Sequence, residues 1–261
     1  MKASTQPSSS GKGLSIATLV AILATLIVNT LSNIIPPQGA NIGEIANTVL
    51  RGVQITPANY AFAIWGLIYL GLIVYGLYQL HATPRTNPGI QKADQSLIVA
   101  CIAQIAWVYL FTVQQFWLSV VAILVILAAL INAYLALRIG EQRVSREQRW
   151  QVHVPFSVYL GWISVATIVN IASALYVSGW TGWGLSAPIW TMIMLIIGAV
   201  IGAIVAIQRA DIAFTLVFVW AYVAIALRQL DNPSIWITAI VAAIALVLSL
   251  VAGRMRQPRS I

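Results

Sequence analysis

Aromatic and amide side chains recur at helical spacing in three apolar segments of this 261-residue chain. In one of them, Tyr159, Trp162, Ala166 and Asn170 are separated by three, four and four positions. At about 100° per residue, these four side chains fall within a stripe about 80° wide on one helix face. Such a stripe suits a flat and mostly apolar ligand, because aromatic faces stack on it and the amide orients it by hydrogen bonding.

Two further segments carry comparable stripes. One holds an amide followed by two aromatic residues at helical spacing, and the other holds an aromatic pair one turn apart, preceded by two more aromatic residues. Together the three stripes predict one ligand-binding set: Tyr60, Phe62, Trp65, Tyr69, Gln104, Trp107, Phe111, Tyr159, Trp162, Ala166 and Asn170. A second interpretation stays open, because Trp and Tyr are common at membrane interfaces and amides also bond across packed helices.

Other chemistry is poorly supported by the residues present. No acidic or basic residue lies near the middle of an apolar segment, where transporters and pumps usually keep an ionisable group. Cys101 is the lone cysteine, and the two histidines, His81 and His153, lie at expected helix ends. We therefore expect a protein that is not an enzyme, with no catalytic residue, no metal ligand and no resident cofactor.

The elements that must position these stripes are membrane helices. The chain is 60% hydrophobic and 8% charged, against about a quarter charged in a soluble domain. Its apolar runs are longer than barrel strands and are apolar on all sides, so an all-α polytopic membrane bundle is expected. About eight transmembrane helices are predicted, at Leu14–Ile35, Ala58–Leu80, Ser96–Val113, Trp117–Leu137, Val154–Tyr176, Ser186–Ile207, Ile212–Leu227 and Ser234–Val251.

The basic residues indicate the orientation of this bundle. With eight helices and a cytoplasmic N-terminus, twelve of the fourteen Lys and Arg residues fall in cytoplasmic segments, and only Arg51 and Arg228 fall outside. Both termini are thus predicted to lie in the cytoplasm. The protein itself is expected in a bacterial plasma membrane, or in a thylakoid or equivalent organelle membrane. The net charge of +8 then indicates lipid head groups as partners, not nucleic acid.

Three other segments carry expectations of their own. The first thirteen residues are polar and Ser-rich, which predicts a disordered tail. Residues 36–57 form the longest extracytoplasmic connection, and they can either fold over the bundle as a lid or remain an ordinary flexible loop. Gly198, Gly202 and Ala206 form a small-residue stripe that favours close helix packing, within the chain in preference to a homodimer.

These motifs resemble the TspO/MBR family, the tryptophan-rich sensory and translocator proteins, which have five membrane helices. The family pattern P-Y-x-x-W-x-x-x-A-x-x-x-N is similar to the stripe from Tyr159 to Asn170, with Val158 in place of the proline. The pattern N-x-x-W-x-x-x-F corresponds to Gln104, Trp107 and Phe111. Pro57 and the aromatic residues after it resemble the family's second helix.

The resemblance covers about residues 14–177, as a TspO-like five-helix bundle, and residues 178–261 look like the three-helix C-terminal extension, with a basic tail, of a longer eight-helix branch. It implies a membrane receptor or translocator for a flat hydrophobic ligand such as a tetrapyrrole, with a sensory, regulatory or transport role. A homodimer is also implied. Two alternatives remain, a membrane enzyme acting on a porphyrin or isoprenoid and a membrane assembly factor.

Overall fold

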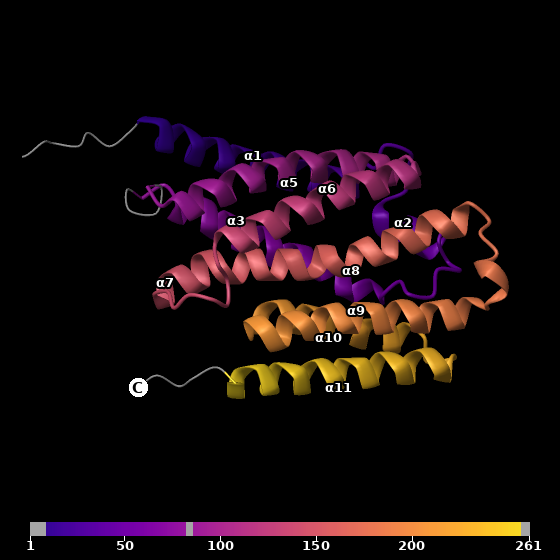
Figure 1. Cartoon of the computed structure of the whole chain (residues 1–261). Coiled ribbons are helices and arrows are strands. Elements are labelled where there is room, and N and C mark those ends of the chain that lie inside the picture. Colours follow the sequence, from indigo (N-terminus) through magenta and orange to yellow (C-terminus); the bar gives the residue numbers. More distant parts are fainter. Residues whose placement is uncertain (1–8, 82–85, 257–261) are drawn as a thin grey trace, which may run out of the picture.

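The computed structural model describes residues 9–81 and 86–256 and folds them into a bundle of long, roughly parallel helices (Figure 1). The long helices follow the apolar runs of the sequence: α1 (Ser9–Ile34), α3 (Ile64–Tyr78), α5 (Pro88–Thr112), α6 (Phe116–Ala136), α8 (Val154–Val177), α9 (Ala187–Arg209), α10 (Ile212–Arg228) and α11 (Pro233–Arg256). The short elements are α2 (Ile42–Asn47), η1 (Asn59–Ala63), α7 (Arg146–Gln148), η2 (Arg149–His153) and η3 (Gly182–Gly184).

The expected all-α membrane bundle is confirmed, and one of its eight predicted spans is a shorter helix. Within the described residues, seven helices are long and apolar enough to cross a membrane. The eighth, α10, has 17 residues and spans about 25 Å, which is the lower limit for crossing a ~30 Å hydrocarbon core. The chain is therefore an integral membrane protein of the polytopic all-α class.

The bundle divides into two groups of helices. Helices α1, α3, α8, α6 and α5 contact one another in that cyclic order, so they close a five-helix ring. Helices α9, α10 and α11 contact one another and form a C-terminal layer, which packs on the ring mainly through α10 against α8. The predicted domain boundary near residue 177 stays a prediction.

Both ends of the bundle have a distinct character. Helix α1 begins and α11 ends at the same end, which we call the tail end (Figure 1). Basic residues gather there, including Lys12, Arg209 and Arg254, while Arg51 and Arg228 lie at the opposite end. The charge pattern thus agrees with an even number of crossings. The assignment of the tail end to the cytoplasm remains a prediction. The predicted disordered tail differs from the structure at residues 9–13, which belong to α1, and residues 1–8 lie outside the described residues.

One helix boundary differs from expectation in a way that matters. Helix α5 begins at Pro88, eight residues before the predicted start, because Asn87 caps it and Pro88 occupies its first turn. Asp94 therefore lies inside the helix, 1% exposed, and accepts a 2.6 Å hydrogen bond from the Tyr75 hydroxyl. Asp211 is likewise buried and accepts hydrogen bonds from Tyr134 and Ser157. Both carboxyls lie toward the tail end and hold helices together there.

Residues 36–57 fold over the opposite end of the ring, and we call them the lid. Their centre is α2, which is closed at its start by a capping box between Asn41 and Glu44. Ile45 and Leu50 are almost fully buried against the bundle, at 0% and 1% exposure. Of the two arrangements that the sequence left open, the folded cover is the one observed.

Candidate functional site

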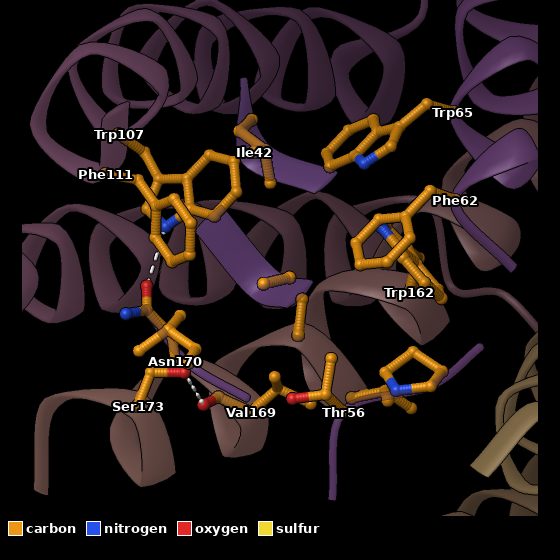
Figure 2. Close-up of a pocket in the computed structure, with 15 residues that line it drawn as sticks. Ile42, Thr56, Phe62, Trp65, Trp107, Phe111, Trp162, Val169, Asn170 and Ser173 are labelled. Carbon is orange, nitrogen blue, oxygen red and sulfur yellow. Dashed lines mark hydrogen bonds between the residues drawn. The ribbon is translucent and has the colours of Figure 1, made fainter. Parts of the chain in front are cut away.

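The lid covers a cavity between α3, α5 and α8. Figure 2 shows Trp107 and Phe111 on one wall, and Phe62, Trp65 and Trp162 on the wall opposite. Asn170 and Ser173 from α8 lie across the far side of the cavity from Trp65. We call this space the aromatic cavity, and its lining is apolar apart from a few hydroxyl, amide and indole groups.

Most of the side chains predicted from the three stripes meet here. Seven of the eleven line the aromatic cavity: Phe62, Trp65, Trp107, Phe111, Trp162, Ala166 and Asn170. They come from η1 and three helices that are far apart in the sequence. The helical spacing therefore identified the inward face of each segment, and the ring brings these faces together.

Three more predicted residues lie behind the cavity wall. Tyr69 and Tyr159 are buried and support the Trp65 ring, with ring-centre distances of 5.8 Å and 6.2 Å. Gln104 is fully buried and accepts a weak 3.4 Å hydrogen bond from the Tyr159 hydroxyl. These three side chains do not line the cavity, and their contacts fix the position of those that do.

Tyr60 is the predicted residue that the structure does not bring to this site. Its side chain is 41% exposed and packs edge-on against Trp220 of α10, with ring centres 5.0 Å apart. It belongs to η1, in which the chain turns after the lid, so its direction differs from that of Phe62 two residues later. The sequence alone did not reveal α10 as its neighbour.

Asn170 holds two walls of the cavity in register. Its side-chain oxygen accepts a 2.7 Å hydrogen bond from the Trp107 indole, and its amide nitrogen donates a 2.9 Å bond to Ser119 of α6 (Figure 2 draws the first). One amide thus joins α5, α6 and α8. An amide that is 1% exposed in an apolar setting needs such partners, because leaving it unpaired is costly.

Sequence reasoning missed two groups of lining residues. The lid contributes apolar residues, of which Ile42, Ala46 and Leu50 close the cavity. On α8, Val169 and Ser173 also line it, three residues after Ala166 and Asn170 respectively. Val169 and Ser173 could have been predicted from the sequence, because a spacing of three places them on the same helix face as Ala166 and Asn170. The lining residues of the lid could not, because they depend on where the lid docks.

Several buried polar atoms near the cavity lack a hydrogen-bond partner. Within the described residues, these include the Tyr69 hydroxyl, the Gln104 amide nitrogen and the Trp162 indole nitrogen. Buried polar groups are nearly always paired in folded proteins. These three groups surround the aromatic wall of α3 and α8, and of the three residues Trp162 lines the cavity itself.

The C-terminal layer holds the lid in place. Arg228 at the end of α10 donates to the carbonyl oxygens of Pro57 and Ala46, each at 3.2 Å. Gln229 donates a 2.8 Å bond to the carbonyl of Gln54, and the Ala58 amide donates to the carbonyl of Ala224. Helix α10 therefore positions the cover of a cavity to which it contributes no lining residue.

The aromatic cavity is narrow in this closed arrangement. Its volume is about 50 Å³, enough for a few water molecules, whereas sites for drug-sized ligands usually measure hundreds of cubic ångströms. A flat molecule would have to separate the two walls, and Ile42 on the lid lies between them.

A family model connects this architecture to known proteins. The model of the TSPO-like protein family matches residues 15–252. The chain belongs to the TSPO-like family. No curated protein and no solved structure is significantly similar to it.

The match to the TSPO-like family extends from α1 into α11, so it includes the C-terminal layer as well as the ring. Membership agrees with the resemblance of the stripes on α3, α5 and α8 to TspO/MBR motifs. It places the chain among membrane proteins of the receptor and translocator kind.

Proposed function

We propose that this protein is a membrane receptor or translocator that binds a flat hydrophobic ligand of the tetrapyrrole kind in the aromatic cavity. The observation that carries the proposal is the arrangement of three indoles, Trp65, Trp107 and Trp162, around one covered space. Indole faces stack on extended ring systems, and several of them around one slot favour a planar ligand over a globular one.

The unpaired polar atoms support the same conclusion. The Trp162 indole nitrogen and the Thr56 hydroxyl both belong to lining residues, can donate hydrogen bonds and lack partners among the described residues. A tetrapyrrole offers ring nitrogens and peripheral oxygen atoms, which can accept such bonds once the walls separate. Donors of this kind would orient the ring in its plane, in addition to the stacking that holds it.

The proposed role is to bind the ligand without converting it. None of the fifteen side chains drawn around the aromatic cavity is acidic, basic or a thiol. General acid–base catalysis needs such a group within hydrogen-bond reach of the reacting atom. The lining therefore favours a role in sensing or carrying the ligand over a role in converting it.

Tryptophan fluorescence tests the proposal directly. We expect purified protein titrated with protoporphyrin to show saturable quenching, and Trp162→Phe to weaken the affinity about 3- to 10-fold, because a smaller ring offers less stacking area. Trp183→Phe is the control, since Trp183 is 81% exposed and lies away from the cavity. Quenching that never saturates, or that is equally strong in all three proteins, would contradict the proposal.

A further inference from the structure

A second and larger cavity adjoins the aromatic one. Its volume is about 350 Å³, and the two cavities share Ile42, Phe62 and Trp65 in their walls. We call it the vestibule. Because the aromatic cavity alone has only about 50 Å³, most of the room available to a ligand at this end of the protein lies in the vestibule.

The vestibule has an unusual lining for a membrane protein. Five asparagines and one glutamate surround it: Asn29, Asn33, Asn41, Glu44, Asn47 and Asn59. They come from the end of α1, from the lid and from the start of η1. Asn29 is buried, whereas Asn33, Glu44 and Asn59 are exposed, so the vestibule opens to the surface and presents hydrogen-bonding groups to a polar occupant.

Hydrogen bonds hold these polar side chains in place. Asn41 and Glu44 bond to each other's backbone in the capping box, and the Asn47 amide donates a 2.9 Å bond to the Asn59 side chain. Asn33 donates to the backbone of Asn29, one turn earlier on α1. Each amide has two donor hydrogens and two acceptor sites, so these bonds leave part of the capacity free to face the cavity.

The side chains that line the vestibule carry negative charge only. Glu44 is the single ionisable side chain among its lining residues, and no lysine or arginine accompanies it. Arg228, at the same end of the bundle, directs its guanidinium at lid carbonyls instead. A carboxylate entering the vestibule would meet only the like charge of Glu44, whereas a neutral or cationic group would meet amides and an attractive charge.

We infer that the vestibule is the subsite for the polar end of the ligand, and that this end is uncharged or cationic. The ligand is then an amphiphile: its flat apolar body lies between the tryptophans, and its hydrogen-bonding end lies among the asparagines. This inference rests on the proposed function of the aromatic cavity. It adds that a free dicarboxylic porphyrin is a poorer ligand than the same ring with its carboxylates masked.

Two probes with one ring system test the inference: protoporphyrin IX and its dimethyl ester. The affinity of each is measured by tryptophan quenching in one detergent, for the native protein and for Glu44→Gln. Comparing proteins with the same probe cancels the partition of that probe into micelles. The glutamine keeps the acceptor that the capping box needs, so the lid should stay folded.

We expect Glu44→Gln to raise the affinity for the dicarboxylate about 3- to 10-fold, while the affinity for the ester changes less than about twofold. Glu147→Gln is the matched control, because Glu147 lies in α7, among the residues that begin the α8 helix at the tail end. Asn33→Lys is a second variant. Asn33 is exposed, so its substitution leaves the core intact, and the added cation should also favour the dicarboxylate.

The outcomes separate the two proposals. Saturable binding with the same ratio of the two affinities in the native protein, Glu44→Gln and Asn33→Lys would overturn the inference and leave the aromatic cavity as the binding site. If neither probe binds the native protein saturably, the proposed function fails and the inference fails with it.

Discussion

The five-helix ring and the C-terminal layer are built from the same kind of apolar helix, but they pack in different ways. In the ring, large aromatic residues and buried amides meet across α3, α5, α6 and α8, as in the bond from Trp107 to Asn170. In the layer, small residues let the helices approach closely: Gly198 of α9 lies against the Tyr222 hydroxyl, and Gly202 lies against Leu246.

This difference teaches how one chain can hold both a cavity and a rigid support. The aromatic cavity and the vestibule both lie at the lid end of the ring, whereas small residues bring the helices of the layer close together. The small-residue stripe on α9 packs within the chain, as the sequence favoured. The layer then uses one edge, α10, to hold the lid over the cavity.

The largest expected effect comes from forcing the two regions apart. Gly161 of α8 faces α10, and a Cβ atom there would lie 3.1 Å from both the Phe214 carbonyl oxygen and the Val217 Cβ. We expect Gly161→Leu to lower the free energy of unfolding by about 2–3 kcal/mol, since the backbone of α10 must move. Thermal unfolding in detergent measures this change.

Gly66→Leu is the control for that experiment, because a Cβ at Gly66 meets nothing within 4 Å. If both variants unfold at the same temperature, the close seam between α8 and α10 does not hold the layer on the ring.

The next effect concerns the polar packing of the ring. Asn170→Leu removes the acceptor of the Trp107 indole, and we expect a loss of about 1–2 kcal/mol in the free energy of unfolding. Ser119→Ala should cost less, because the bond from Trp107 to Asn170 remains. Thermal unfolding and the wavelength of tryptophan emission check both expectations, and equal losses in the two variants would argue against a special role of the indole bond.

A smaller and more local effect is expected where the layer meets the lid. Arg228→Gln removes the bonds to Ala46 and Pro57, so the lid should open more often, at a cost of about 1 kcal/mol in docking free energy. Hydrogen exchange of the amides in residues 42–57 should become about 5-fold faster. Arg51→Gln, a change at the exposed arginine of the lid itself, should leave that exchange unchanged.

The smallest effect is expected at the tail end, where Glu141 of the ring pairs with Arg209 of the layer. Hydrogen bonding from Arg138, with help from Arg209, lowers the pKa of the Glu141 carboxyl. A lowered pKa in the folded state means that the contribution is present above the ordinary glutamate pKa and is lost as the pH falls through the lowered one. Relative to the intrinsic exchange rate at each pH, the protection of the amides in residues 138–145 should therefore fall only in acid, and Glu141→Gln should abolish that pH dependence.

Much of the ring could be predicted from single helices. Runs of apolar residues set the number and type of the spans, because a backbone in lipid must bond to itself. The spacing of Trp162, Ala166 and Asn170 identified the face of α8 that lines the cavity, since a helix repeats every 3.6 residues. The early start of α5 was missed because the predicted segment began with the apolar run after Asp94, although a tyrosine hydroxyl allows this carboxyl to be buried within the helix.

The lid and the vestibule could not be predicted in the same way. Residues 36–57 carry no long periodic pattern, so their docking depends on partners from elsewhere, above all Arg228 and Gln229 more than 170 residues later. Tyr60 was assigned to the cavity for the same reason, because nothing near it in the sequence indicates its contact with Trp220.

The sequence by itself determined that this is a membrane bundle and which faces of its helices turn inward. These properties are local, since they depend on hydropathy and helical period alone. Only the tertiary structure decided that the faces enclose a narrow covered cavity, that a polar vestibule adjoins it, and that the C-terminal layer holds the lid. Those properties depend on which distant segments meet, and contacts between helices determine that.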